Sequence, residues 1–402
     1  MSLASGRQTP TSEPRIYGHV EDGYGPLHDV FVENFRLRRD LGASCAVYVR
    51  GRRVVDLWGG VADRRSGRPW DADTAAVIFS CSKGLVAIGA YLLVERGLLD
   101  LDVPIATWWP AFAANGKEAI TLRDALSHRA GLAVLDADLS KADVLAWTPV
   151  IRAIEAQRPR SSPADGHLYH AMTYGWIVGE VMRRVTGVTP GVFLRETLAE
   201  PLGLRAWIGL PREAQSSVAW MEPPLPDEDS PAAREAARLS NDSAEVERSL
   251  TMGGAFGFPD DGGIVTFNDP DIQAAEIPAA NGIATSRALA RIYAGCVSAI
   301  DGPPLLSRES LADAMMVRAA GAQLSGMPDD GARWGTGFQL ASPPTQPMLG
   351  PSGFGHAGAG GQLAFGDIEH EVGFAYLSNQ MGGYGDARAR ELTAALRRVL
   401  RA

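Results

Sequence analysis

Lysine is scarce in this chain, because only three of its 38 Lys and Arg residues are lysines: Lys83, Lys117 and Lys141. The basic residues are outnumbered by 47 acidic ones, and the formal net charge of −9 argues against nucleic acid as a partner. Histidine is also rare, with seven residues and none in an H-E-x-x-H or similar pattern. We therefore expect no metal site and no other cofactor.

Cysteine is rarer still, with three residues at positions 45, 81 and 296. An odd number without C-x-x-C spacing favours reduced, buried thiols over a disulfide framework or a zinc site. We interpret Cys81, the neighbour of Ser80, as a small apolar filler on the inner side of a helix.

Long apolar runs and targeting signals are missing too. The longest near-continuous apolar run, LVAIGAYLLV at 85–94, is shorter than the roughly 20 residues that a membrane-spanning helix needs. Residues 1–15 lack the apolar core of a secretory signal. We therefore expect a globular protein of the cytoplasm, without a membrane partner.

The serine-hydrolase signature G-x-S-x-G does not occur, and neither does the strand–helix alternation of a doubly wound sheet. Instead, residues 43–60 alternate apolar and polar side chains around a Gly-Arg turn, which predicts a β-hairpin in an antiparallel sheet. Residues 80–97 are apolar on nearly every face and predict a helix buried at the centre of the molecule.

The rest of the chain divides into a helical middle and a second set of strands. Helices, turn clusters and Pro-rich loops predict an inserted helical domain over 106–285, including helices at 121–132 and 174–187. Its acidic, Pro-rich stretch at 221–248 is interpreted as a surface excursion, either a plain solvated loop or the margin of a lid. Strand patterns return at 334–341, 361–367 and 372–380, and an amphipathic helix closes the chain at 387–400. The prediction is an α+β fold with a discontinuous sheet domain, 20–105 and 286–402.

The segment FSCSKG at 79–84 is the strongest chemical signal. Ser80 stands three residues before Lys83, a spacing that puts both side chains on one helix face, and no other lysine has a serine at this distance. A buried lysine loses its proton readily and can then accept the proton of an attacking serine. The alternative is a helix-capping serine followed by a solvent-facing lysine. The apolar helix argues against that alternative, because a buried segment rarely carries an unpaired ammonium.

A serine–lysine pair needs a second proton carrier for the leaving group, and a tyrosine phenol can serve. Tyr169, in DGHLYHAMTYG at 165–175, is the candidate. We interpret the nearby His128 and His170 as hydrogen-bonded structural groups, and Tyr174 as part of the buried stripe of its helix.

Several segments, in this order and at these separations, resemble the serine β-lactamase-like superfamily, in particular the class C β-lactamase fold as used by family VIII carboxylesterases. They are FSCSKG, TLRDALSHRAGL, GHLYHAMTYGWIVGEVMRRVTG, EIPAANGIATSRALARIY and GHAGAGGQLAFGD with GFAYLSNQM. The resemblance covers roughly residues 20–400. It implies a β-lactamase/penicillin-binding-protein-like fold, in which an antiparallel sheet is flanked by terminal helices and carries the inserted helical domain.

The resemblance also implies roles for individual residues. Ser80 would be the acylated nucleophile, Lys83 its base partner, and Tyr169, which begins the Y-x-N motif of the family, the proton shuttle. Which of Lys83 and Tyr169 is the formal base stays open, because coupled groups titrate as a pair.

The K-T-G motif of the family maps onto residues 356–358, so His356 and Gly358 become candidate substrate-binding residues. Ala359 and Ser80 would give the two backbone N–H groups of the oxyanion hole. Trp334 is a further candidate for lining the acyl or alcohol pocket.

Two positions depart from the family pattern. The Asn of Y-x-N is Ala171, and the Lys of K-T-G is His356, a side chain that is mostly neutral at pH 7. Both changes weaken recognition of an acidic amide and favour a neutral ester.

The sequence therefore predicts a carboxylic ester hydrolase that acts on small esters through an acyl-enzyme on Ser80. The alternatives are a β-lactamase or peptidase-type amide hydrolase, an acyltransferase of the same fold, and a non-catalytic binding protein.

Overall fold

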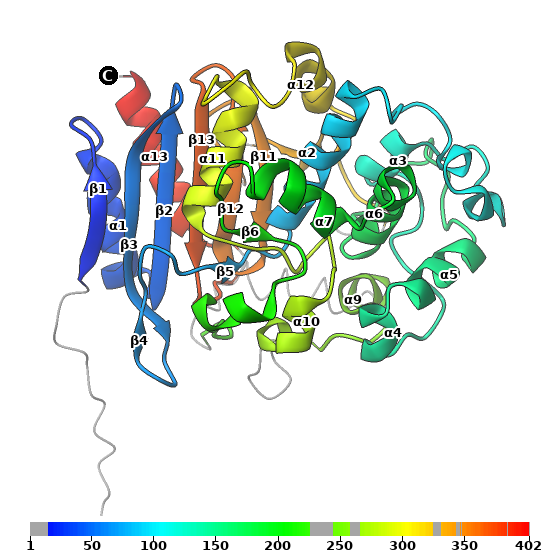
Figure 1. Cartoon of the computed structure of the whole chain (residues 1–402), viewed down its shortest axis with the longest axis horizontal. Helices are drawn as coiled ribbons and strands as arrows, with labels where there is room; N and C mark the ends of the chain where they lie inside the picture. The colour runs from blue at the N-terminus through cyan, green and yellow to red at the C-terminus, as the bar shows by residue number, and fades with distance from the viewer. Residues whose placement is uncertain are drawn as a thin grey trace, which may run out of the picture.

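A large antiparallel sheet forms one side of the molecule (Figure 1). The computed structural model describes residues 15–225, 244–257, 266–324, 331–342, 346, 348–383 and 385–401. Within these residues the sheet has the order β1-β3-β2-β13-β12-β11-β10-β9-β8, with β4 beside β3. Its strands are β1 (Ile16–Val20), β2 (Gly42–Val49), β3 (Arg52–Asp63), β4 (Arg68–Pro69), β8 (Ala319–Ala320), β9 (Arg333–Trp334), β10 (Gln339–Leu340), β11 (Gly353–Gly358), β12 (Gln362–Asp367) and β13 (Val372–Ser378).

The predicted hairpin at 43–60 is confirmed as β2 and β3, which pair antiparallel from Ala43↔Gly59 to Val49↔Arg52. Gly51 occupies the turn with a φ of +78°, a conformation that glycine adopts without steric cost.

Helices cover both faces of the sheet. On one face, α1 (Gly25–Leu37) and α13 (Arg388–Arg401) pack together, with Phe31 and Leu396 in a core that includes Phe374 of β13. On the other face lies α11 (Ser286–Val297), so close to β13 that a Cβ at Gly373 would meet the carbonyl of Ala290 at 2.1 Å. The predicted α+β architecture, with terminal helices against an antiparallel sheet, is confirmed.

Helix α2 (Cys81–Glu95) is buried between the sheet and the helical half of the molecule, as predicted. It contacts β11 on one side and α6 (Thr173–Thr186) and α7 (Pro190–Leu194) on the other. Its apolar side chains belong to the largest hydrophobic cluster of the described residues. The helix therefore connects the cores of both halves, and its first turn lies at the junction between them.

The remaining helices lie mostly to the right of the sheet in Figure 1. The α-helices are α3 (Leu122–Leu126), α4 (Lys141–Leu145), α5 (Thr148–Ala156), α9 (Ala244–Thr251), α10 (Pro270–Ala274) and α12 (Arg308–Met315). Shorter turns are η1 (Ile105–Thr107), η2 (Pro110–Ala113), η3 (Arg195–Ala199), η4 (Arg212–Ser217), η5 (Thr266–Asn268) and η6 (Ala359–Gly361). In the described part of the chain, none of the helices combines the length and the apolar character that crossing a membrane requires.

The structure differs from the sequence prediction in several places, among them the short strands β4 and β8, which were not predicted. A second small sheet, β5 (Ala76–Val77), β7 (Ile283–Ala284) and β6 (Ala206–Trp207), was not predicted, because strands this short show no alternation. Strand β1 was missed as well. Helix α3 ends at Leu126 and not at Gly131.

Of the predicted excursion at 221–248, residues 226–243 lie outside the described residues. The division into a sheet domain and an inserted domain stays a prediction.

A buried charge cluster ties α13 to the sheet. Arg388, which is 2 % exposed, donates to Asp40 at 2.7 Å, to the carbonyl of Gly360 at 2.9 Å and to Asp386 at 2.9 Å. Asp40 also accepts a hydrogen bond from Ser378 at 2.8 Å, at the end of β13. The cluster therefore fixes the turn after β11, residues 359–361, which includes the predicted oxyanion residue Ala359.

Replacing Arg388 is expected to destabilise the fold strongly, because Asp40 would be left buried without a cation. Breaking a buried ion pair from one side costs about 3–5 kcal/mol. Urea unfolding of Arg388→Met should show a loss of this size. The exposed Arg398 on the same helix gives the matched control, since Arg398→Met should change the free energy of unfolding by no more than about 0.5 kcal/mol. Equal losses in both variants would contradict the assignment.

Candidate active site

Ser80 stands at the N-terminal boundary of α2, on a tightly held turn. Phe79 has a φ of +45°, and the N–H of Ile78 donates to Gly282 at 2.8 Å, which continues the small sheet. The hydroxyl of Ser82 accepts the N–H of Gly282 at 2.9 Å and so attaches the first turn of α2 to the same segment. The Ser80 hydroxyl is thereby held at a helix N-terminus, where backbone dipoles favour developing negative charge.

Lys83 is fully buried one turn further on. Its Nζ lies 3.2 Å from Ser80 Oγ, and donates to the carbonyl oxygens of Ala171 at 2.7 Å and Ala279 at 3.0 Å. Burial lowers the pKa of Lys83 well below its ordinary value. The two carbonyls account for both N–H bonds of a neutral amine, so its lone pair is left for the Ser80 hydroxyl. This arrangement can accept the proton of Ser80.

Tyr169 completes the hydrogen-bonded group, since its phenol donates to Ser80 Oγ at 3.0 Å. Nζ of Lys83 lies 4.8 Å from the centre of the Tyr169 ring. Burial raises the pKa of Tyr169, so the phenol holds its proton at neutral pH. The structure thus brings together the three side chains that the sequence singled out as catalytic.

His128 and His170 hold the segment that carries Tyr169. The N–H of His170 donates to Nδ1 of His128 at 3.1 Å, and the N–H of Leu168 donates to the His128 carbonyl at 3.1 Å. Nε2 of His170 accepts the N–H of Leu132 at 3.0 Å. Burial lowers the pKa of His170 to about 4 and that of His128 well below its ordinary value, so both rings are neutral. These backbone bonds agree with the structural role expected for both histidines.

The predicted oxyanion residues lie at the meeting of α2 and β11. A Cβ at Gly358 would lie 2.4 Å from the Ile78 carbonyl, so only glycine lets β11 approach the turn before Ser80. Among the described residues, the backbone N–H groups of Ser80 and Ala359 have no hydrogen-bond acceptor. Two free N–H donors beside a serine hydroxyl can stabilise an oxyanion.

His356 and Trp334 lie against Tyr169. The Trp334 and Tyr169 rings stack with centroids 5.1 Å apart, and the His356 ring lies 5.5 Å from Trp334. His356 is 3 % exposed, its Nδ1 lies 2.6 Å from the Ala357 carbonyl, and burial lowers its pKa to about 3. At neutral pH it therefore supplies no positive charge.

The cavity above Ser80 has a volume of about 300 Å³. Its described lining is Ser80, Tyr169, Gln323, Ala332, Trp334, Gln339, His356, Ala357, Gly358 and Ala359, with no Asp, Glu, Lys or Arg. The sequence analysis did not identify Gln323, Ala332 and Gln339 of this lining, nor the carbonyls that bind Lys83. No local sequence pattern indicates these carbonyls, because Ala171 and Ala279 lie 88 and 196 positions from Lys83 in the sequence.

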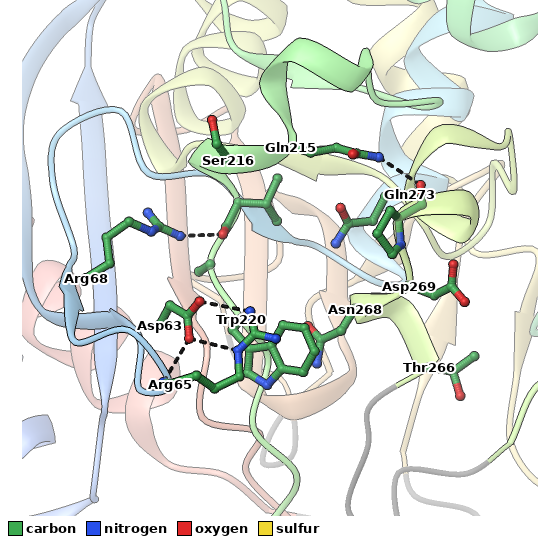
Figure 2. Close-up of a pocket in the computed structure, with 13 residues that line it drawn as sticks. Asp63, Arg65, Arg68, Gln215, Ser216, Trp220, Thr266, Asn268, Asp269 and Gln273 are labelled. Atoms are coloured by element: carbon green, nitrogen blue, oxygen red, sulfur yellow. Dashed lines mark hydrogen bonds and ion pairs between the residues drawn. The ribbon is translucent and has the colours of Figure 1, made fainter.

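A larger hollow of about 580 Å³ lies elsewhere, and Ser80 is not part of its lining (Figure 2). There Arg65 pairs with Asp63 and lies over the Trp220 ring, 3.2 Å from its centre. The side-chain amides of Gln273 and Gln215 donate hydrogen bonds to backbone carbonyls. We assign no reaction to this hollow. Nor do the described residues contain a group of three or more His, Cys, Asp or Glu that could hold a metal ion.

Comparison with known proteins agrees with this geometry. The Beta-lactamase family model matches residues 31–398, and the chain belongs to that family. The Esterase/beta-lactamase LipL of Mycobacterium tuberculosis is 35 % identical over 387 residues, which cover 94 % of this chain and 86 % of LipL. The chain is therefore a hydrolase of the β-lactamase fold with esterase relatives.

Two solved structures are similar over nearly the whole chain. One is a family VIII carboxylesterase with 30 % identity and a TM-score of 0.84, covering 96 % of this chain and 100 % of that one. The other is a penicillin-binding protein homologue from Caulobacter crescentus with 33 % identity and a TM-score of 0.82, with the same coverage. The resemblance inferred from the motifs is confirmed.

Burial of a neutral Lys83 predicts a pH-dependent stability. Between the lowered pKa of the folded protein and 10.5, the unfolded chain holds a proton on Lys83 that the folded chain lacks. Stability therefore rises with pH in this window, by about 1.4 kcal/mol per pH unit for one full proton. In Lys83→Met this contribution is absent, so urea unfolding at pH 7, 8 and 9 should show a shallower rise than wild type. Parallel curves would mean that Lys83 is charged in the folded protein.

Proposed function

We propose that this protein is a carboxylesterase that hydrolyses small neutral esters through an acyl-enzyme on Ser80. The observation that carries the proposal is the hydrogen-bonded group of Ser80, Lys83 and Tyr169 beside a cavity whose described lining has no Asp, Glu, Lys or Arg. The esterase relatives support the same reading.

In the acylation step, Ser80 Oγ attacks the ester carbonyl while its proton passes to the Lys83–Tyr169 pair. The carbonyl oxygen gains the negative charge and accepts hydrogen bonds from the N–H groups of Ser80 and Ala359. When the tetrahedral intermediate collapses, the C–O bond to the alcohol breaks, and Tyr169 delivers a proton to the leaving oxygen. Lys83 returns a proton to Tyr169, so the pair ends as it began.

Deacylation repeats the sequence with water in place of the alcohol. The pair takes a proton from water, hydroxide adds to the acyl carbon, and Ser80 leaves as an alkoxide that regains a proton from the pair. Lys83 and Tyr169 titrate as a coupled pair, so the proton taken up is assigned to the pair and not to one of the two residues.

Electrostatics favours an ester over an acidic β-lactam. A substrate carboxylate that enters the cavity loses hydration and gains no ion pair from the described lining residues, none of which is Lys or Arg. His356, where the family pattern has lysine, is neutral above a pKa of about 3, and Ala171 has no side-chain amide to offer. An alkoxide also leaves more easily than an amide nitrogen, so the missing groups matter less for an ester.

The proposal is tested by intact mass spectrometry after exposure to a fluorophosphonate, together with turnover of p-nitrophenyl butyrate and nitrocefin. We expect one adduct in wild type, none in Ser80→Ala, and butyrate turnover well above nitrocefin turnover. Nitrocefin turnover above butyrate turnover would favour the amide-hydrolase alternative. Absence of both adduct and turnover would favour a binding protein, and ester products formed with an added alcohol would indicate acyl transfer.

The lowered pKa of Lys83 also predicts the pH profile of the esterase. Because the active base is the neutral amine, kcat/KM for p-nitrophenyl butyrate should fall as the pH drops through the pKa of Lys83, which burial places well below its ordinary value of 10.5. His356 is already neutral above a pKa of about 3, so His356→Gln should leave the acid limb at the same pH. A limb that moves in His356→Gln would assign the titration to the histidine.

A further inference from the structure

Gln339 lines the cavity at the edge of β11. Strand β10 pairs with β11 at Gln339↔Gly355, and the Gln339 side chain continues the ladder because its Oε1 accepts the N–H of Ala357 at 3.0 Å. The side chain is half-buried, within the lining that includes Ser80. Gln339 is therefore held by backbone at the wall of the reaction cavity.

The bond to Ala357 decides which way the Gln339 amide points. A backbone N–H can only donate, so the amide oxygen must face Ala357 and the NH2 group must face away from it. No described residue accepts a hydrogen bond from this NH2 group. Gln339 thus turns its oxygen toward the strand and presents its NH2 donors to the cavity.

Gln323 is oriented in the same way on another part of the wall. Its Oε1 accepts the backbone N–H of Tyr169 at 2.9 Å, which commits the oxygen and leaves the NH2 group as a donor. Gln323 is also half-buried and lines the cavity with Ser80. Two amides, both oriented by backbone donors, therefore offer neutral hydrogen-bond donors beside the nucleophile.

We propose that Gln339 and Gln323 are specificity-determining residues, which select neutral esters that carry a second oxygen acceptor besides the scissile carbonyl. A ketone, ether or hydroxyl oxygen in the acyl or the alcohol part fits these donors. The inference rests on the esterase function proposed above. An all-carbon analogue displaces water from the amide donor but offers no acceptor in its place. The donor is then left without a hydrogen bond, so binding of this analogue is disfavoured.

A carboxylate is the less suitable acceptor. The described lining residues include no cation to pair with it, and the free energy that it loses on desolvation exceeds what one or two neutral amide donors give back. A neutral oxygen is desolvated more easily. The donors therefore discriminate among neutral substrates.

The test compares two pairs of matched esters. p-Nitrophenyl 4-oxopentanoate against p-nitrophenyl 4-methylpentanoate places the oxygen in the acyl part, and 2-methoxyethyl butyrate against butyl butyrate places it in the alcohol. The readout is the ratio of kcat/KM within each pair, divided by the ratio of alkaline hydrolysis rates. In wild type we expect the oxygen-bearing ester to be preferred by about 3- to 10-fold in at least one pair, the effect of one net hydrogen bond.

The variants separate donation from the structural bond to Ala357. Gln339→Glu, assayed at pH 8, keeps an acceptor for the Ala357 N–H but has no donor, whereas Gln339→Met loses both. The preference should disappear in both variants, or in Gln323→Met if that amide makes the contact. A purely structural Gln339 would lower kcat/KM for both members of a pair equally and leave the ratio unchanged. Gln215→Met, in the hollow of Figure 2, is the matched control and should keep the wild-type ratio.

The outcomes separate this inference from the proposed function. The inference would be overturned if wild type hydrolysed butyrate esters without a preference in either pair. It would also be overturned if the preference survived in all three cavity variants. In both cases the proposed esterase function would stand. No turnover of any ester, with no Ser80 adduct, would overturn both. A preference lost only in the Gln339 or Gln323 variants would establish the donors as selective groups.

Discussion

The burial of Lys83 without a carboxylate partner is the constraint on which the rest of the site depends. An amine can remain neutral there because backbone carbonyls of Ala171 and Ala279, and not a charged side chain, satisfy it. Each carbonyl needs its own support, which His128 gives to the segment before Ala171 and Asn281 gives to the turn around Ala279. Because α2 lies at the centre of the molecule, Lys83 on its first turn contacts both the segment of Ala171 and the segment of Ala279.

The described lining of the cavity beside Ser80 has no charged side chain, whereas a buried ion pair lies elsewhere against the sheet. Arg388 and Asp40 form a buried pair on the side of the sheet where α13 packs, and Arg388 reaches Gly360, next to Ala359. The turn that carries Ala359, the predicted oxyanion residue, is thus fixed by an ion-pair cluster, while the described lining of the cavity carries no Asp, Glu, Lys or Arg. The residues that hold the turn at Ala359 therefore differ from the described residues that line the cavity, apart from Ala359 itself.

Long periodic segments made the fold predictable, and short ones did not. The hairpin of β2 and β3, the buried helix α2 and the helix α6 with its C-terminal Gly187 all follow from local patterns. The small sheet of β5, β7 and β6 has no such pattern, because its strands of two residues are held by neighbours distant in sequence. Yet this sheet holds the turn before Ser80, so the part of the fold next to the candidate nucleophile was the hardest to predict from the sequence.

The sequence by itself determined the three candidate catalytic residues, Ser80, Lys83 and Tyr169, because Ser-x-x-Lys spacing on a helix and the order of the motifs are local or sequential properties. It also determined that residue 356 is a histidine and residue 171 an alanine. The tertiary structure decided how deeply Lys83 and His356 are buried, and this burial is the main cause of both pKa shifts. It alone decided which way the Gln339 and Gln323 amides point, because backbone N–H groups from remote strands and loops set their orientation.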